Sequence, residues 1–160
     1  MNDAALRKQL LAFLAGEGAH MTLEEAVADF PDEAINSRPP NVDYSPWQLL
    51  EHIRLTQADI LEYVVNPGYA ERSWPDDYWP AADATATPKQ FGETIRGCLA
   101  DRKTLADLVA DPDYDIFAVI ANTRGHTLLR EIRIAADHTA YHVGEFAILR
   151  QVMGTWGEGH

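Results

Sequence analysis

The chain has 160 residues, of which 46% are hydrophobic, so it is long enough to bury one sizeable core and is globular rather than disordered. It has 13 basic and 25 acidic residues, and the resulting net charge of −12 disfavours binding to nucleic acids or anionic membranes. The single cysteine, Cys98, excludes an intrachain disulfide framework and is typical of a reducing compartment. With no membrane-spanning run and no signal peptide evident, we predict one cytoplasmic domain over residues 1–160.

The N-terminal part predicts two helices. Leucine and phenylalanine recur at helical spacing over residues 6–14, which indicates a first helix that ends near Gly16 or Gly18. A capping-box pattern beginning at Thr22 predicts a short second helix that runs to Phe30, where the following proline stops it.

Two longer helices follow, each with a capping box and a proline at the first helical position. They begin after Ser45 and Thr87, and we expect them to run to about Val65 and Ala110. The segment between them, residues 67–86, is rich in aromatic residues and is predicted to be a loop that clamps onto the helices.

The last predicted helix is the longest. Apolar and small residues recur at helical spacing over residues 125–154, with Arg150 suited to the last turns and Gly154 to a C-terminal cap. The preceding apolar stretch, residues 115–120, has no pattern that assigns it to helix or strand. Four principal helices joined by loops long enough for crossovers predict an all-α four-helix bundle with an inward-facing site.

Three histidines form the candidate site. His138 and His142 are one helical turn apart, so both imidazoles can reach one small ion. His52 borders the apolar stripe of the helix over residues 45–65 and supplies a third nitrogen donor. Three histidines with an open coordination position are typical of a catalytic divalent-metal site, whereas each histidine alone is more often an ordinary core or surface residue. We interpret the remaining histidines, which are His20, His126 and His160, as non-ligands.

Several short patterns resemble the DinB-like superfamily of metal-binding helical proteins. They are Trp47-Gln-Leu-Leu-Glu-His52, Tyr78-Trp79-Pro80, Leu128-Leu-Arg-Glu131, Asp137-His-Thr-Ala-Tyr-His142-Val-Gly-Glu145 and Leu149-Arg150. The resemblance implies an up-down-down-up four-helix bundle, often paired as a homodimer. It also implies that His52, His138 and His142 bind a divalent ion, nickel or zinc, and that a low-molecular-weight thiol is a co-substrate of a transferase, isomerase or hydrolase.

Glu145 stands where many DinB-like proteins carry glutamine. It lies seven residues after His138, on the same helix face, so we predict that it binds the metal or hydrogen-bonds a ligand imidazole. The alternative is a solvated carboxylate or a structural salt bridge. Asp59 shares a helix face with His52 and can orient an imidazole, although a surface position is favoured, and Tyr141 is expected to pack.

Two functions fit these patterns. The first is a metal-dependent enzyme in which the ion acts as a Lewis acid on a small-molecule substrate. The second is a non-catalytic metal- or ligand-binding module, again a dimer, in which the histidines stabilise the bundle. An open coordination position with access to solvent favours the first, and a saturated or closed site favours the second.

Overall fold

A computed structural model describes residues 3–121 and 123–157. Its α-helices are α1 (Ala4–Ala15), α2 (Leu23–Val27), α3 (Pro46–Val65), α4 (Pro88–Ala110) and α5 (Leu128–Met153), with a short 3-10 helix at Asp32–Ala34. Within the described residues there is no β-strand, only an isolated bridge between Val119 and Thr127. The all-α prediction is therefore confirmed. In the described part of the chain, no helix is both long and apolar enough to span a membrane.

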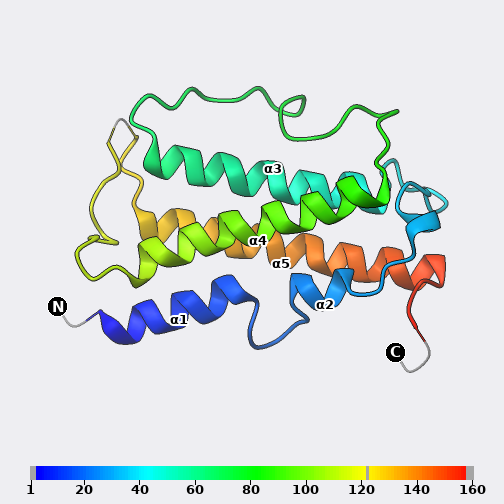
Figure 1. Ribbon diagram of the computed structural model, residues 1–160. Coiled ribbons are helices and arrows are strands. Elements are labelled where there is room, and N and C mark those ends of the chain that lie inside the picture. The colour runs from blue at the N-terminus through cyan, green and yellow to red at the C-terminus, as the bar shows by residue number, and fades with distance from the viewer. Residues whose placement is uncertain (1–2, 122, 158–160) are drawn as a thin grey trace.

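The helices form an up-down-down-up bundle (Figure 1). Helices α1 and α2 follow one another along one edge, α3 and α4 both run in the opposite direction, and α5 runs back. Helix α3 packs against α4 and α5, which in turn contact α1, while α2 contacts α5. Because α3 and α4 are parallel, the loop over residues 66–87 must return along the length of the bundle, and it passes over α3. This crossover brings the aromatic residues of the loop to α3.

Local capping fixes where the long helices begin. Side chains of Thr22, Ser45 and Thr87 accept hydrogen bonds from the backbone three residues later, and reciprocal side-chain bonds complete all three predicted capping boxes. Gly154 has a φ of 63° and ends α5 in the left-handed conformation expected of a C-terminal cap. The caps thus confirm the predicted starts of α3 and α4.

Two predicted boundaries extended too far. Helix α5 begins at Leu128 rather than near Gly125, because Thr127 caps it and Gly125 adopts a positive φ of 89° in the preceding turn. Helix α2 ends at Val27 rather than Phe30, and Asp29, with a φ of 51°, turns the chain away.

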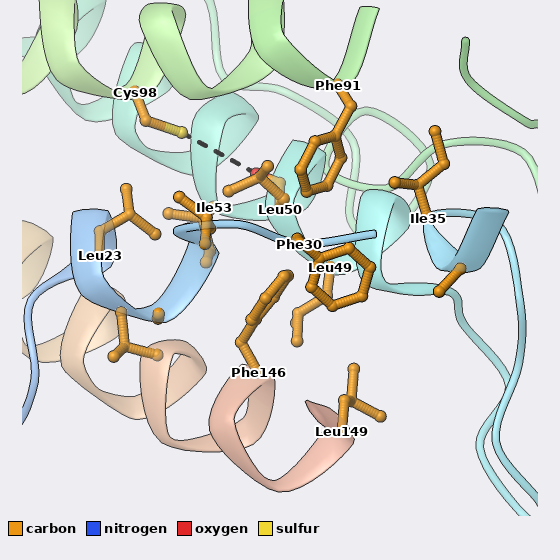
Figure 2. Close-up of a cluster of buried hydrophobic side chains, with 14 residues drawn as sticks. Leu23, Phe30, Ile35, Leu49, Leu50, Ile53, Phe91, Cys98, Phe146 and Leu149 are labelled. Atoms are coloured by element: carbon orange, nitrogen blue, oxygen red, sulfur yellow. Dashed lines mark hydrogen bonds between the residues drawn. The ribbon is translucent and has the colours of Figure 1, made fainter. Parts of the chain in front are cut away.

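The core consists of two clusters of buried side chains along the bundle. In the cluster shown in Figure 2, the rings of Phe30, Phe91 and Phe146 meet between α2, α4 and α5. The Phe30 and Phe146 rings lie edge to face at 5.3 Å, a favourable geometry for aromatic rings. Cys98 is fully buried there, its thiol faces the Leu50 carbonyl oxygen at 3.9 Å, and burial raises its pKa to about 12. Cys98 is therefore a buried thiol of the core, held in its protonated form.

Segment 115–120 is an ordered loop rather than a helix or a strand. Ile116 is fully buried in the second core cluster, and its carbonyl oxygen accepts a hydrogen bond from the Leu129 amide. The Ile120 amide donates to the carbonyl oxygen of His126. These bonds tie the loop to the start of α5 and position residues 123–127 beside α3.

Candidate metal centre

The three predicted histidines meet at one point between α3 and α5. The Nε2 atom of His52 lies 3.2 Å from Nε2 of His142 and 3.1 Å from Nε2 of His138, and the α5 pair is 3.1 Å apart. His52 and His142 are buried and His138 is half-buried. All three present the same ring nitrogen, and together they can hold one metal ion.

Hydrogen bonds at the opposite ring nitrogens fix the direction in which two of these imidazoles face. Nδ1–H of His52 donates to the Tyr78 carbonyl oxygen at 2.7 Å, and Nδ1–H of His142 donates to the Glu145 carboxylate. Since each neutral ring carries one proton, the Nε2 atoms of His52 and His142 are then both unprotonated. Two bare lone pairs 3.2 Å apart cannot hydrogen-bond to each other, and a shared cation is the natural partner for them.

Burial favours the neutral forms of His138 and His52. It lowers the pKa of His138 to about 3, and the neighbouring His142 and His52 lower it further in the same direction. Burial also lowers the pKa of His52, opposed by its hydrogen bond to Tyr78. Neutral imidazole is the form that binds a metal, so the cluster is ready to coordinate an ion near neutral pH.

Glu145 is part of this centre. Besides its bond to His142, its carboxylate accepts a hydrogen bond from the Tyr44 hydroxyl at 3.3 Å. Burial is the main cause, and the charge of Glu145 the second, that raises the pKa of Tyr44 to about 12. This phenol therefore remains protonated and acts as a hydrogen-bond donor. The hydrogen-bond partners of Glu145 in the described part of the chain are thus a ligand imidazole and a phenol. Among the described residues Glu145 forms no salt bridge with a lysine or an arginine, and its contact with His142 is an ion pair only when that imidazole is protonated.

The crossover loop covers His52. The indole ring of Trp79 stacks on the His52 imidazole with centroids 3.9 Å apart and planes within 6°. The ring of Tyr44 lies against the same indole at 5.3 Å. The expectation that aromatic residues clamp this loop to the helices is confirmed for Trp79, whereas Trp74 remains 69% exposed beside His52.

Asp59 holds the segment that orients His52. The expectation of a surface acid at this position was wrong: Asp59 is buried because the crossover loop packs over it. Its carboxylate accepts hydrogen bonds from the Tyr69 hydroxyl at 2.9 Å and the Tyr78 hydroxyl at 2.8 Å, and pairs with Arg72 at 3.0 Å. Asp59 therefore acts on His52 indirectly, through Tyr78.

Two other side chains occupy different positions from those expected. Tyr141 does not pack into the bundle but is 66% exposed, with its ring edge against His142 at 4.8 Å. His126 lies before α5 begins, where its Nδ1 hydrogen-bonds the Tyr63 hydroxyl at 2.7 Å. Neither His126 nor His20, which contacts the Met21 carbonyl oxygen, joins the cluster, and His160 lies outside the described residues.

Sequence reasoning missed two contributors to the site. The Tyr78 carbonyl oxygen is a backbone group, so no residue type marks it. Tyr44 precedes α3 by two residues and gave no signal by spacing, because it reaches Glu145 from a different element. Only the aromatic composition of the crossover loop, which includes the Tyr78-Trp79 pair, pointed toward this region.

The fold and the site together define an up-down-down-up helical bundle with a three-histidine cluster shared by its second and fourth long elements, α3 and α5. The family model of the DinB superfamily matches residues 5–146, which include all three histidines and Glu145. The chain therefore belongs to the DinB superfamily. No curated protein and no solved structure matches it.

Proposed function

We propose that this protein is a metal-dependent enzyme whose divalent ion is held by His52, His138 and His142. The observation that carries the proposal is the convergence of three Nε2 atoms within 3.2 Å, two of them unprotonated because their Nδ1–H groups are engaged. A nitrogen-only donor set suits nickel or zinc better than magnesium or calcium, which prefer oxygen. When bound, the ion would supply Lewis-acid polarisation of a substrate group.

The number of protein ligands favours an enzyme over a purely structural site. Structural zinc sites almost always use four protein ligands, whereas catalytic sites use three and leave a position for substrate. The Glu145 carboxylate is already engaged by His142 and Tyr44. Thiol-dependent transfer, isomerisation or hydrolysis remains the expectation drawn from the family.

Metal analysis of protein purified without a histidine tag tests the proposal. We expect one nickel or zinc ion per chain, and cobalt-substituted protein should change its absorption spectrum when a small anion such as azide occupies the open position. Protein that binds no divalent ion would contradict the metal site. A bound ion that no exogenous ligand reaches would instead support the alternative of a non-catalytic module.

We also propose that the protein forms a homodimer through α5. Tyr141, Ile148 and Val152 are each at least 60% exposed, and their spacing of seven and four residues places them on one helix face. An apolar stripe of this kind is typical of a helix that pairs with another helix. Light scattering should give twice the mass of the chain, and Ile148→Glu should shift it toward the monomer. A monomeric parent protein at high concentration would contradict the dimer.

A further inference from the structure

A cavity separate from the histidine cluster lies between α3, the crossover loop and the start of α5. Its volume is about 470 Å³. One wall includes Asp59, Tyr63 and Tyr78, and the opposite wall includes Arg124, His126 and Glu131. Of these side chains, Asp59 and Tyr78 also support the orientation of His52, and the polarity of the lining is unusual for a gap between packed helices.

Helix geometry places two lining residues of this cavity on the same helix faces as the three histidines. Asp59 follows His52 by seven residues on α3, and Glu131 precedes His138 by seven residues on α5. Seven residues correspond to about 10 Å along a helix and only about 20° around it. Because α3 and α5 run in opposite directions, both steps lead toward the same end of the bundle. Asp59 and Glu131 therefore lie about 10 Å along their helices from the histidines, on the same faces of both helices.

Tyr78 contacts both the histidine cluster and the cavity. Its main-chain carbonyl oxygen accepts the His52 Nδ1–H bond, while its side chain lines the cavity and donates to Asp59. A molecule that fills the cavity thus contacts the residue that orients a metal ligand.

The buried acids of the cavity already have partners within the protein. Asp59 is compensated by Arg72 and by two phenol hydroxyls. Glu131 is paired with Arg130, and the His126 ring lies 3.7 Å from its carboxylate. These two carboxylates are therefore not free to select a cationic ligand.

Two charged side chains remain available at the opening. Arg124 and Glu71 both line the cavity, are both exposed, and have no ion-pair partner among the described residues. One is a cation from the loop before α5 and the other is an anion from the crossover loop. A ligand that satisfies both must carry one negative and one positive group, with an apolar or hydrogen-bonding body that fits against the tyrosine rings.

We propose that this cavity binds the zwitterionic head group of the substrate, with a carboxylate at Arg124 and an ammonium at Glu71. The substrate would be a small amino-acid-like molecule whose chain is long enough for its reacting group to reach the three histidines while the head group stays in the cavity. This inference rests on the proposed metal-dependent function, and it adds the class of substrate and the means by which it is anchored.

Thiols of graded length test whether one molecule can occupy both the cavity and the metal site. The probes are ω-mercapto-α-amino acids with increasing numbers of methylene groups, added to cobalt-loaded protein, in which thiolate coordination changes the absorption spectrum. Plain alkanethiols and ω-mercaptocarboxylates of matched lengths serve as controls for the head group. We expect the zwitterions to bind about tenfold more tightly than the alkanethiols once the chain is long enough to join the cavity to the metal, and no better when it is shorter.

Two exposed arginines provide a matched pair of variants. Arg124→Gln should abolish the length-dependent gain, whereas Arg133→Gln, on the exposed face of α5 and outside the cavity, should retain it. Head-group affinity that does not depend on chain length, or that survives Arg124→Gln, would overturn the proposal. Equal affinity of the carboxylate and zwitterion series would overturn the assignment of an ammonium to Glu71.

Failure of the metal site gives a different result from failure of the cavity. If no thiol of any series changes the cobalt spectrum, the proposed metal-dependent function is contradicted. Calorimetry on metal-free protein with the longest zwitterion then tests the head group alone. Binding that Arg124→Gln removes would support the cavity assignment, and absence of binding to the parent protein would overturn it.

Discussion

The main-chain carbonyl oxygen of Tyr78 accepts a hydrogen bond from Nδ1 of His52 at 2.7 Å, while the hydroxyl of the same tyrosine donates to buried Asp59 at 2.8 Å. The orientation of one imidazole in the cluster is therefore set by a carboxylate seven residues further along its own helix, through a residue of the crossover loop. Such outer contacts hold a metal ligand in one tautomer and one orientation.

Tyr78→Phe tests this relationship. The substitution retains the carbonyl oxygen but removes the hydroxyl that fixes the segment to Asp59, so we expect divalent-metal affinity to fall by up to about tenfold, at the lower end of the outer-contact range. Tyr69→Phe is the matched control, because it removes the other phenol bound to Asp59 without touching a residue that contacts His52. Equal losses in the two variants, measured by competition with a metal chelator, would mean that Asp59 only stabilises the loop.

Substitution of single histidines distinguishes those that bind the metal from those that do not. His138→Ala and His142→Ala should each remove most metal binding, because two nitrogen donors do not make a strong site. His52→Ala should do the same from the other helix, whereas His126→Ala should leave stoichiometry unchanged, since His126 contacts Tyr63 instead. Metal content after dialysis provides the comparison, and an unchanged ion content in the His52 variant would remove α3 from the site.

Glu145→Gln should retain the fold and weaken metal binding by about 10–100-fold. An amide oxygen can still accept the His142 Nδ1–H bond, but without the negative charge it makes the imidazole a poorer donor to the ion. The same change should shift the pKa of Tyr44 from about 12 toward its ordinary value, because the Glu145 charge contributes to the elevation. Metal titrations across pH that superimpose on those of the parent would assign Glu145 to structure alone.

The metal-free protein should lose stability in mild acid. Burial lowers the pKa of His138 to about 3, whereas an unfolded histidine titrates near 6.5. As the pH falls below about 6.5, the unfolded state takes up a proton that the folded state does not, so the stabilising contribution present above that pH declines progressively toward pH 3. Denaturant unfolding at several pH values should show a shallower decline for His138→Gln than for the parent. Identical slopes would show that His138 titrates normally in the folded protein.

Much of the secondary structure follows directly from the sequence. The capping boxes at Ser45 and Thr87 act over four residues, so the starts of α3 and α4 depend on no distant contact. The pairing of His138 with His142 is equally local, because one helical turn brings the two side chains together in any α-helix. The apolar stripe over residues 45–65 pointed to His52 as a third donor, and the family resemblance added the up-down-down-up topology, in agreement with the family model that matches residues 5–146.

Only the tertiary structure decided what surrounds the three histidines. The parallel arrangement of α3 and α4 forces the crossover loop back over α3, which buries Asp59 and brings the Tyr78 carbonyl oxygen and the Trp79 ring to His52. A main-chain acceptor has no residue type, and helix periodicity reports which face a side chain occupies but not what packs against it. For the same reason Tyr141, expected to pack, lies exposed: its environment depends on what lies beside α5 and not on α5 itself.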